Sequence, residues 1–460
     1  MSCVSYLKSG LSALSMLAAV SLPLLLGACQ SGAPAQGGLP GLLDRIAPGA
    51  PQRVAPQPAQ PGQANIPPAT TPQLPRPAAP SLAIETQPLP GPMLTPPGGT
   101  DMIRIAFLAP LSGPNAGLGR ALLDAAQLAL FDLADDRLAL LPRDTEGQPE
   151  KAAAAAQQAL AEGAQIIIGP LFANEAAVVG PLARERGVKV LSFSTDRSVA
   201  GNGVYLLGFT PDQQIERVMT FARTKGVTRY ALLAPDSAYG NAVAQAAELA
   251  AQQAGGRLLR QDRYPSDTGD LTPVVRRFAN ALRTLPPRGP EEPPVEGVDP
   301  NLPRPVDAVL LPEGGARLRA LAPLLPYFDI DPRAVRFLGT GLWEDAGLGS
   351  EPALQGGWYA APAPEGFAEF SRRFEQSFGR RPVRLASLAY DTTALVGILA
   401  RRGDFSDAAL TNPDGFAGYD GIFRFLPNGL VQRGLAVLEV QRRGSRVIDP
   451  APASFQQPLN

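Results

Sequence analysis

Histidine is absent from the 460-residue sequence, and cysteine occurs only twice, at positions 3 and 29. Without histidine the chain lacks the commonest general base, the Ser-His and Cys-His nucleophile systems and every imidazole metal ligand. Charges of the two signs nearly cancel, with a formal net charge of −1, so bulk electrostatics give no argument for nucleic acid as a partner. We therefore predict a protein that is not an enzyme and that holds no metal or cofactor.

The N-terminal segment has the layout of a secretory leader. Lys8 supplies a short basic start, residues 11–26 are almost wholly apolar, and the small residues Gly27 and Ala28 follow. The apolar run is too short and too interrupted for a convincing membrane-spanning helix. We therefore expect residues 1–28 to be a signal peptide.

The motif Leu26-Gly27-Ala28-Cys29 resembles a bacterial lipobox. In that class of signals the chain is cut before the cysteine, which then carries acyl chains. The resemblance implies lipidation of Cys29; the alternative is an ordinary signal peptide followed by an incidental cysteine. Cys3 would leave with the leader, so no thiol would remain for a disulfide or a metal. Gln30 favours an outer-membrane address, and we expect a lipid-anchored protein on the periplasmic face of the envelope.

Residues 29–100 form a segment rich in proline, alanine and glutamine, in which large apolar side chains are sparse. Such a composition buries too little surface to offset the entropy of ordering, so we predict a disordered tether. Its reach lies between roughly 45 Å as a flexible coil and roughly 200 Å as polyproline II. The tether is either a passive spacer or a stalk that presents a folded domain to a partner.

From Met102 onward, about ten apolar runs alternate with amphipathic helical patterns. The runs are continuously apolar, which predicts strands covered on both faces, as in parallel sheets with helices on each side. Because ten strands exceed one compact sheet, we predict an α/β protein with two doubly wound parallel-sheet lobes. A proline-rich stretch, residues 286–305, predicts an exposed inserted loop, either uncommitted or a contact surface.

Ligands of doubly wound sheets bind beyond the carboxyl ends of the strands. Five predicted loops there, residues 109–119, 169–175, 192–196, 234–243 and 312–315, carry hydroxyls and helix N-termini suited to a carboxylate. Each such residue alone is most simply a helix cap, but the five loops together predict a ligand cleft. A carbohydrate-cleaving enzyme would need paired carboxylates, and no motif unites the candidates Asp144, Glu146 and Glu313.

Four motifs resemble the type I periplasmic binding proteins of the leucine/isoleucine/valine-binding kind. They are IAFLAPLSGPNAGLG, GAQIIIGPLFANEAAVVGPLARERGVKVLSFSTD, YALLAPDSAYGNAVAQA and FAEFSRRFEQSFGRRPVRLASLAYDTTALV, within residues 103–447. The ending, residues 418–440, resembles that family's closing β-hairpin with Asn428-Gly429 as its turn. The segments IIIGPLFANE and FLGTGLWED, with the stalked lipoprotein layout, most resemble the penicillin-binding protein activator lipoproteins.

The resemblance implies two lobes joined by a three-crossover hinge that closes on a ligand. Lobe 1 would comprise residues 101–210 and 345–404, lobe 2 would comprise residues 211–344 and 405–448, and residues 449–460 would form a tail. The loops FANE and SFSTD would hold a ligand carboxylate, and Tyr239 and Glu313 would serve the far side. The expected ligand-binding residues are Ser112, Asn174, Ser192, Ser194, Thr195, Tyr239 and Glu313. Phe172, Phe193 and Trp343 would crowd the cleft, shaping a larger ligand or filling a cleft without one.

Two non-enzymatic functions follow from this resemblance. The main expectation is a lipoprotein that activates a peptidoglycan synthase, a penicillin-binding protein, through a surface that biases the partner between states. The alternative is the substrate-binding lipoprotein of an ABC importer, which captures amino acids or related small polar solutes for a permease. The ligand, the partner and the oligomeric state stay open.

Overall fold

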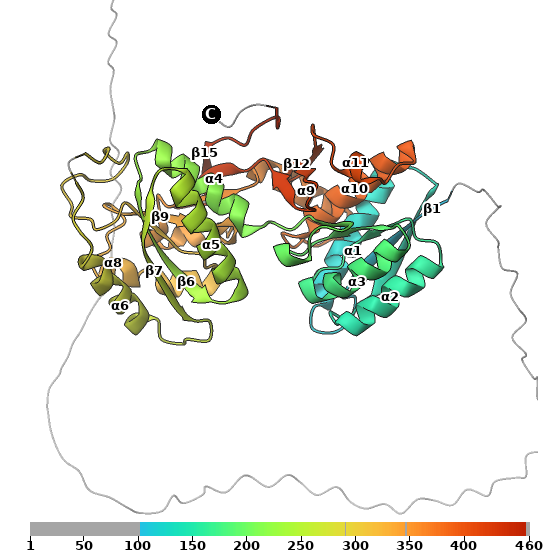
Figure 1. Cartoon of the computed structure of the whole chain (residues 1–460), viewed down its shortest axis with the longest axis horizontal. Helices are drawn as coiled ribbons and strands as arrows, with labels where there is room; N and C mark the ends of the chain where they lie inside the picture. The colour runs from blue at the N-terminus through green and yellow to red at the C-terminus, as the bar shows by residue number, and fades with distance from the viewer. Residues whose placement is uncertain (1–101, 290, 346, 457–460) are drawn as a thin grey trace, which may run out of the picture. The chain divides into compact units, whose positions relative to one another are not determined.

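The computed structural model describes residues 102–289, 291–345 and 347–456, which contain two sheets flanked by helices (Figure 1). The predicted signal peptide, the lipidation of Cys29 and the tether lie outside the described residues. The first sheet has five parallel strands in the order β2-β1-β3-β4-β5. These strands are β1 (Ile103–Ala109), β2 (Leu138–Asp144), β3 (Ile166–Ile168), β4 (Lys189–Ser192) and β5 (Val204–Leu206).

The second sheet has seven strands in the order β15-β14-β10-β9-β8-β6-β7. The strands β6 to β10 pair in parallel, whereas β14 and β15 add an antiparallel edge. Their bounds are β6 (Arg229–Asp236), β7 (Arg257–Pro265), β8 (Ala308–Leu310), β9 (Arg336–Gly339), β10 (Trp358–Ala361), β14 (Ala436–Val440) and β15 (Ser445–Asp449). All ten apolar runs of the sequence are strands, which confirms the predicted α/β class.

Helices cover both faces of the first sheet. On β1, Ile105 and Phe107 pack against one set of helices, and Ala106 and Leu108 pack against the opposite set. The first set is α1 (Ala116–Leu133), α9 (Pro364–Phe378) and α10 (Ala386–Arg402), and the second is α2 (Pro149–Ala161) and α3 (Ala173–Glu185). The continuous apolar runs are therefore explained by two separate cores, one on each side of the strands.

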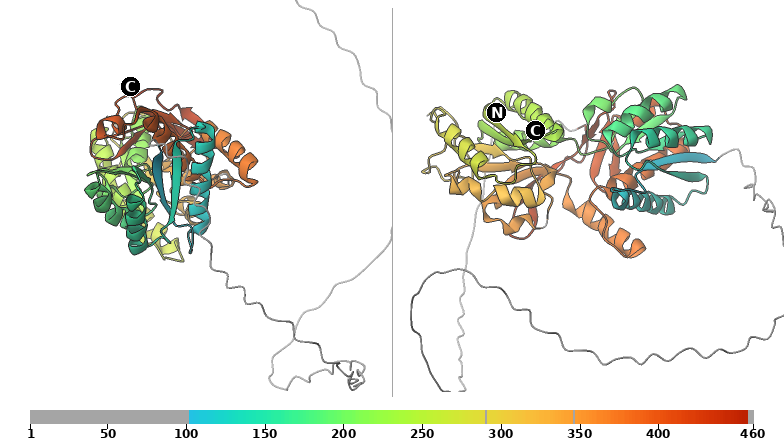
Figure 2. Two further views of the ribbon diagram at one scale, coloured as in Figure 1. Left: turned by 90° about the vertical axis from the view of Figure 1, so that its right-hand side faces the viewer. Right: turned by 90° about the horizontal axis from the view of Figure 1, so that it is seen from below.

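The second sheet is built in the same way, as the further views in Figure 2 also show. Tyr230 and Leu232 on β6 face one set of helices, and Ala231 and Leu233 face the other. The first set is α4 (Pro211–Thr224) and α5 (Ala238–Gln253), and the second is α6 (Thr272–Arg283), α7 (Gly315–Leu321) and α8 (Leu324–Tyr327). Short helical turns complete the described chain: η1 (Arg197–Val199), η2 (Gly341–Trp343), η3 (Leu348–Ser350), η4 (Pro352–Leu354) and α11 (Asp407–Leu410).

The chain passes between the two sheets three times, after β5, after β10 and after a small third sheet. The third sheet contains β11 (Phe416–Gly418), β12 (Gly421–Phe425) and β13 (Val431–Arg433). The hairpin between β12 and β13 turns at the expected Asn428-Gly429, where Gly429 has a φ of 79°. The number of crossovers and this turn agree with the expectation from the sequence.

Two lobe boundaries differ from the expected ones. The expected lobe 1 began again at residue 345, but β10 is hydrogen-bonded to β9 and β14 in the second sheet. The expected lobe 2 began again at residue 405, but Phe423 and Phe425 of β12 pack into the core of the first sheet. The second difference arises because the chain leaves the first lobe only after β13. Just two residues separate β13 from β14, so this short connection is the last crossing between the lobes.

The proline-rich stretch, residues 286–305, is packed against the second lobe and is not simply an exposed loop. Its described residues contain no helix or strand. Arg288 forms an ion pair of 3.0 Å with Asp307, whose side chain is buried. Val295 is buried in the core that α4 and α5 share with the sheet. These contacts explain how so many prolines are accommodated next to the strands β6 and β8.

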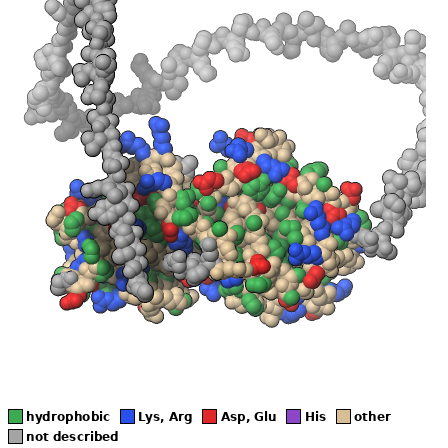
Figure 3. All heavy atoms as spheres, turned by 90° about the horizontal axis from the view of Figure 1, so that it is seen from above, with side chains coloured by type: hydrophobic (Ala, Val, Ile, Leu, Met, Phe, Trp, Pro, Cys, Tyr) green, Lys and Arg blue, Asp and Glu red, His purple; other side chains and the backbone are tan. Residues whose placement is uncertain are grey.

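The surface carries no large field of one sign on the face shown in Figure 3, where acidic and basic side chains are interspersed. This arrangement agrees with the near-zero net charge. Within the described part of the chain, no helix has both the length and the hydropathy that crossing a membrane requires.

Candidate functional site

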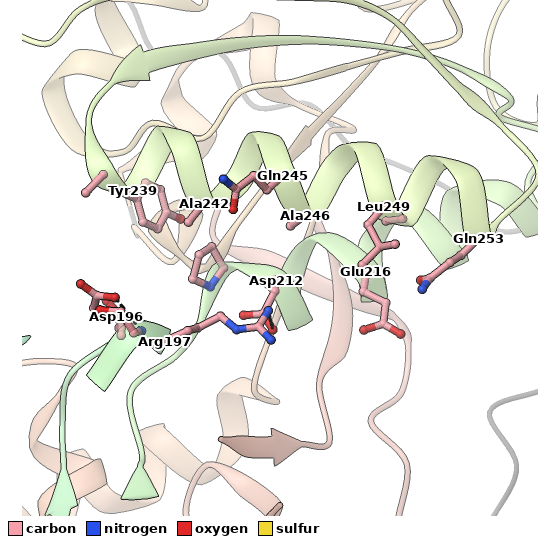
Figure 4. Close-up of a pocket in the computed structure, with 15 residues that line it drawn as sticks. Asp196, Arg197, Asp212, Glu216, Tyr239, Ala242, Gln245, Ala246, Leu249 and Gln253 are labelled. Atoms are coloured by element: carbon pink, nitrogen blue, oxygen red, sulfur yellow. Dashed lines mark hydrogen bonds and ion pairs between the residues drawn. The ribbon is translucent and has the colours of Figure 1, made fainter. Parts of the chain in front are cut away.

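A groove of about 850 Å³ runs along α4 and α5 to the loop that follows β4 (Figure 4). Residues 195–198 of that loop line the groove, and residues between positions 238 and 253 on α5 form one long wall. The loop after β4 lies at the carboxyl end of a strand, as does the first turn of α5 after β6. The groove therefore begins where doubly wound sheets place their ligands, and its volume lies within the usual range of roughly 300–1,000 Å³ for small-molecule sites.

The wall formed by α5 is largely apolar and carries short side chains, because alanine recurs along it. Ala242, Ala246 and Ala250 recur at every fourth position and line the groove together with Leu249. The helix starts at a close backbone approach: a Cβ atom on Gly240 would lie 2.0 Å from the carbonyl oxygen of Pro235. The Ser237 hydroxyl caps this end by accepting a hydrogen bond of 3.1 Å from the backbone N–H of Gly240.

The opposite wall is negatively charged. Asp196, Asp212 and Glu216 line the groove, and Arg197 is the only basic side chain among the lining residues. Arg197 forms an ion pair of 3.0 Å with Asp212, which leaves Asp196 and Glu216 without a cationic partner there. Partial burial, together with the charge of Asp212, raises the pKa of Glu216. The groove therefore favours a positively charged group over an anion.

Tyr239 lies in the first turn of α5, next to the carboxyl ends of the strands. Its hydroxyl lies 2.7 Å from the hydroxyl of Thr340, in the loop after β9. Burial raises the pKa of Tyr239 to about 12, against the smaller, lowering effect of the Thr340 hydrogen bond. The phenol therefore stays neutral at physiological pH and offers a hydrogen-bonding group that is already held in place.

Of the seven ligand-binding residues expected from the sequence, Thr195 and Tyr239 line this groove. Ser192 is fully buried and donates a hydrogen bond of 2.9 Å to the carbonyl oxygen of Pro170. Ser194 is also buried, and its hydroxyl accepts a hydrogen bond from the backbone N–H of Asp196. These two serines support the shape of the loop after β4, so they position Thr195 and Asp196 without facing the groove themselves.

The other three expected residues lie away from the groove. The backbone N–H of Ser112 donates to Asp144, and Asn174 is exposed on the first turn of α3. Glu313 already accepts a hydrogen bond of 2.6 Å from the Tyr264 hydroxyl and pairs with Arg317 at 3.2 Å. Its carboxylate is therefore engaged inside the second lobe. Asp144 and Glu146 are neighbours in the first lobe, whereas Glu313 is engaged with Tyr264 in the second lobe.

The aromatic residues expected to crowd a cleft belong to the hydrophobic cores. Trp343 is fully buried in the second lobe, where its indole N–H donates to the carbonyl oxygen of Leu311. Phe193 is buried in the first lobe, and Phe172 packs partly against the same core. The expectation that these rings fill a cleft is wrong for Trp343 and Phe193, because their rings point into the layers behind the strands.

The acidic wall was not expected from the sequence, because the expected ligand-binding residues all lie at or next to strand ends. Asp212 and Glu216 lie four positions apart on α4, so they share one face of the helix. This spacing was a usable signal, but the partner wall comes from a different helix, α5. Among the described residues, no group of acidic or cysteine side chains has the arrangement of a metal site.

A second polar cluster, the interlobe cluster, consists of Glu344, Arg384, Asp391, Asp420 and Arg433. Arg384 pairs with Asp420 at 2.8 Å and with Glu344 at 3.0 Å. Asp391 accepts hydrogen bonds from the backbone N–H groups of residues 419 and 420. Burial, followed by the nearby charge of Asp420, raises the pKa of Asp391 to about 7.

Asp391 should make the protein less stable as the pH rises from about 4 to about 7. Because its pKa is higher in the folded chain than in the unfolded chain, the folded state binds more protons in this window, and the free energy of unfolding falls with pH. Urea unfolding at several pH values should show this slope, and Asp391→Asn should flatten it. An unchanged slope in the variant would mean that other carboxyl groups cause the dependence.

Comparison with known proteins finds similarity over most of the described chain. Residues 102–445 match the sequence profile of a family described as periplasmic binding protein. An uncharacterized protein of Rickettsia prowazekii is 22% identical over 233 residues, a match that spans 51% of this chain and 59% of that protein.

Solved structures show the same fold at low sequence identity. A structure described as a branched-chain amino acid ABC transporter of Rhodospirillum rubrum is 19% identical with a TM-score of 0.62, covering 75% of this chain and 100% of the other. A leucine binding protein of Thermotoga maritima is 18% identical with a TM-score of 0.55, covering 76% and 99%. A solute binding protein of Rhodopseudomonas palustris, in complex with 3,4-dihydroxybenzoic acid, is 18% identical with a TM-score of 0.56, covering 78% and 100%.

Proposed function

Because this chain belongs to the periplasmic binding protein family, we propose that it captures a small solute for an ABC importer. The family consists of binding proteins, in agreement with the prediction that the chain is not an enzyme. This proposal was the alternative in the sequence analysis, and the solute-binding proteins among the structural relatives favour it over the main expectation. The observation that carries it is the groove between the strand-end loop at residues 195–198 and α5.

We further propose that the solute carries a protonated amine. Glu216 and Asp196 provide negative charge without a cationic partner in the groove, and Tyr239 offers a fixed hydroxyl. An amino acid or a related amine satisfies this wall, whereas a benzoate-like anion would be repelled by it. The apolar wall at Ala242 and Ala246 would contact the uncharged part of such a solute.

The proposal predicts thermal stabilisation by amine-bearing solutes. At a hundredfold excess over Kd, a bound solute should add about 2.7 kcal/mol to the free energy of unfolding. Calorimetry measures this stabilisation for two classes of solute: leucine and tyramine, which carry an amine, and benzoate and 4-hydroxybenzoate, which do not. Glu216→Gln should weaken amine binding about fivefold, whereas Glu248→Gln, an exposed change on α5 outside the groove lining, should change nothing. A panel in which no solute binds would contradict solute capture.

The activation of a peptidoglycan synthase is a second proposal that rests on the sequence resemblance alone. The lipidation of Cys29, the outer-membrane location and the tether at residues 29–100 remain expectations from the sequence, and none of them decides between the two functions. Mass spectrometry of the mature chain would detect the acyl groups. Co-purification of a synthase with a protein that binds no solute would favour activation over import.

A further inference from the structure

The interlobe cluster contains one side chain that bridges the two lobes. Arg384 precedes α10 and is held by groups of the first lobe: its Nη1 donates 3.0 Å to the Ser387 hydroxyl and pairs with Asp420 at 2.8 Å. The guanidinium also lies over the ring of Phe367, with 4.5 Å between its carbon atom and the ring centroid. The first lobe alone therefore fixes the position of this cation.

The second lobe supplies one acceptor to Arg384. The Oε2 atom of Glu344 accepts a hydrogen bond of 3.0 Å from the Nε of Arg384. Glu344 directly follows η2, which is anchored by the buried Trp343, so this carboxylate moves with the second lobe. Burial raises the pKa of Glu344, and the charge of Arg384 opposes this effect. Arg384, a group of the other lobe, therefore compensates part of the cost of burying this carboxylate.

The crossover segments next to this pair are joined to one another by side-chain contacts. Phe209, in the crossover between β5 and α4, lies between the guanidinium groups of Arg384 at 4.8 Å and Arg433 at 4.9 Å. Arg433 ends β13 and donates a hydrogen bond of 2.7 Å to the carbonyl oxygen of Leu207. Two crossovers are therefore tied together, and the pair formed by Glu344 and Arg384 is a contact that lobe opening could break without disturbing them.

We propose that Glu344 and Arg384 form an interlobe latch, in which Arg384 positions the second lobe and thereby sets the fraction of molecules that can hold solute. The role in solute affinity rests on the proposed function, whereas the latch itself does not. Opening would leave Arg384 paired with Asp420 and would return Glu344 to water. Both charged groups are therefore stabilised in the open state as well, Arg384 by Asp420 and Glu344 by water. The contact between them can for this reason form and break reversibly. The apparent affinity for a solute falls in proportion to the competent fraction.

The test measures lobe opening directly in the full chain. Spin labels at Phe131→Cys and Tyr327→Cys, which are 79% and 75% exposed in the first and second lobe, report the interlobe distance by pulsed electron resonance. The native cysteines, at positions 3 and 29, are replaced by serine in this experiment. Without solute, Glu344→Gln should shift the population toward longer distances, with about a tenfold change in the ratio of the two states. The exposed Glu369→Gln, on α9, is the matched control.

The same variants separate a latch from a merely structural role. Glu344→Gln should weaken binding of the amine ligand about tenfold, and Arg384→Met should add little further loss when combined with it. Arg384→Lys keeps the positive charge, so its closed population should be larger than that of Arg384→Met. Unchanged distances in Glu344→Gln would overturn the latch, even if Arg384→Met fails to fold. If no solute binds the unaltered protein, the proposed function fails, and the distance measurement still decides on the latch.

Discussion

Replacing Trp343 with alanine should lower the free energy of unfolding by about 3–5 kcal/mol, the usual cost of removing a large aromatic side chain from a core. Trp343 is fully buried, and its indole N–H is satisfied by Leu311. The surrounding chain cannot close the cavity easily. Gly339 and Gly357 approach the ring so closely that a Cβ atom on them would lie 2.2 Å and 2.8 Å from it.

Urea unfolding followed by circular dichroism measures this loss. The neighbouring Leu342 provides the control because its side chain is 47% exposed, so Leu342→Ala should cost well under 1 kcal/mol. Equal losses in the two variants would contradict the placement of Trp343 in the core. The outcome also bears on the binding site: a tryptophan in a cleft would alter solute affinity, whereas a core tryptophan alters stability.

Replacing Asp420 with alanine should cost about 3 kcal/mol, because the change leaves buried positive charge without its partner. Asp420 is fully buried and accepts both the Arg384 ion pair and a hydrogen bond of 2.8 Å from the Ser387 hydroxyl. Burial lowers the pKa of the neighbouring Arg433, and the charge of Asp420 is the largest effect that opposes it. Without Asp420, one carboxylate fewer compensates the positive charges of Arg384 and Arg433.

A second measurement distinguishes this electrostatic effect from a packing defect. The charge of Asp420 helps to raise the pKa of Asp391, so Asp420→Ala should move that pKa downward and flatten the dependence of stability on pH. Asp136→Ala, an exposed change in the same lobe, should affect neither the stability nor the slope. A stable Asp420→Ala variant with an unchanged pH slope would show that the cluster is not coupled through this carboxylate.

The central strands were predictable from the sequence because they are buried on both faces, which leaves an apolar run such as residues 103–109. The loop after β4 was predictable for the same reason, since the end of the run marks the end of the strand. The role of Ser192 was not predictable: a serine at a strand end can face a ligand or a neighbouring carbonyl, and only the packing around Pro170 decides this.

The interlobe cluster could not be found from sequence spacing. Glu344 and Arg384 are 40 residues apart, and Asp420 lies a further 36 residues along the chain. Each belongs to a different segment, and they meet only because the chain passes between the lobes three times. The groove has a different origin: it requires α4 and α5 to pack side by side (Figure 4), which the acidic pair on α4 alone does not reveal.

The small third sheet and the strand β14 have a consequence for the order in which the cores are completed. Phe423, Phe425 and Val431 complete the first core, and Val437 and Leu438 complete the second. Both cores are therefore completed by segments that follow residue 420, far along the chain from the strands that they cover. A chain that lacks these segments is expected to expose apolar surface of both cores, so we expect neither lobe to reach full stability until they have been synthesised.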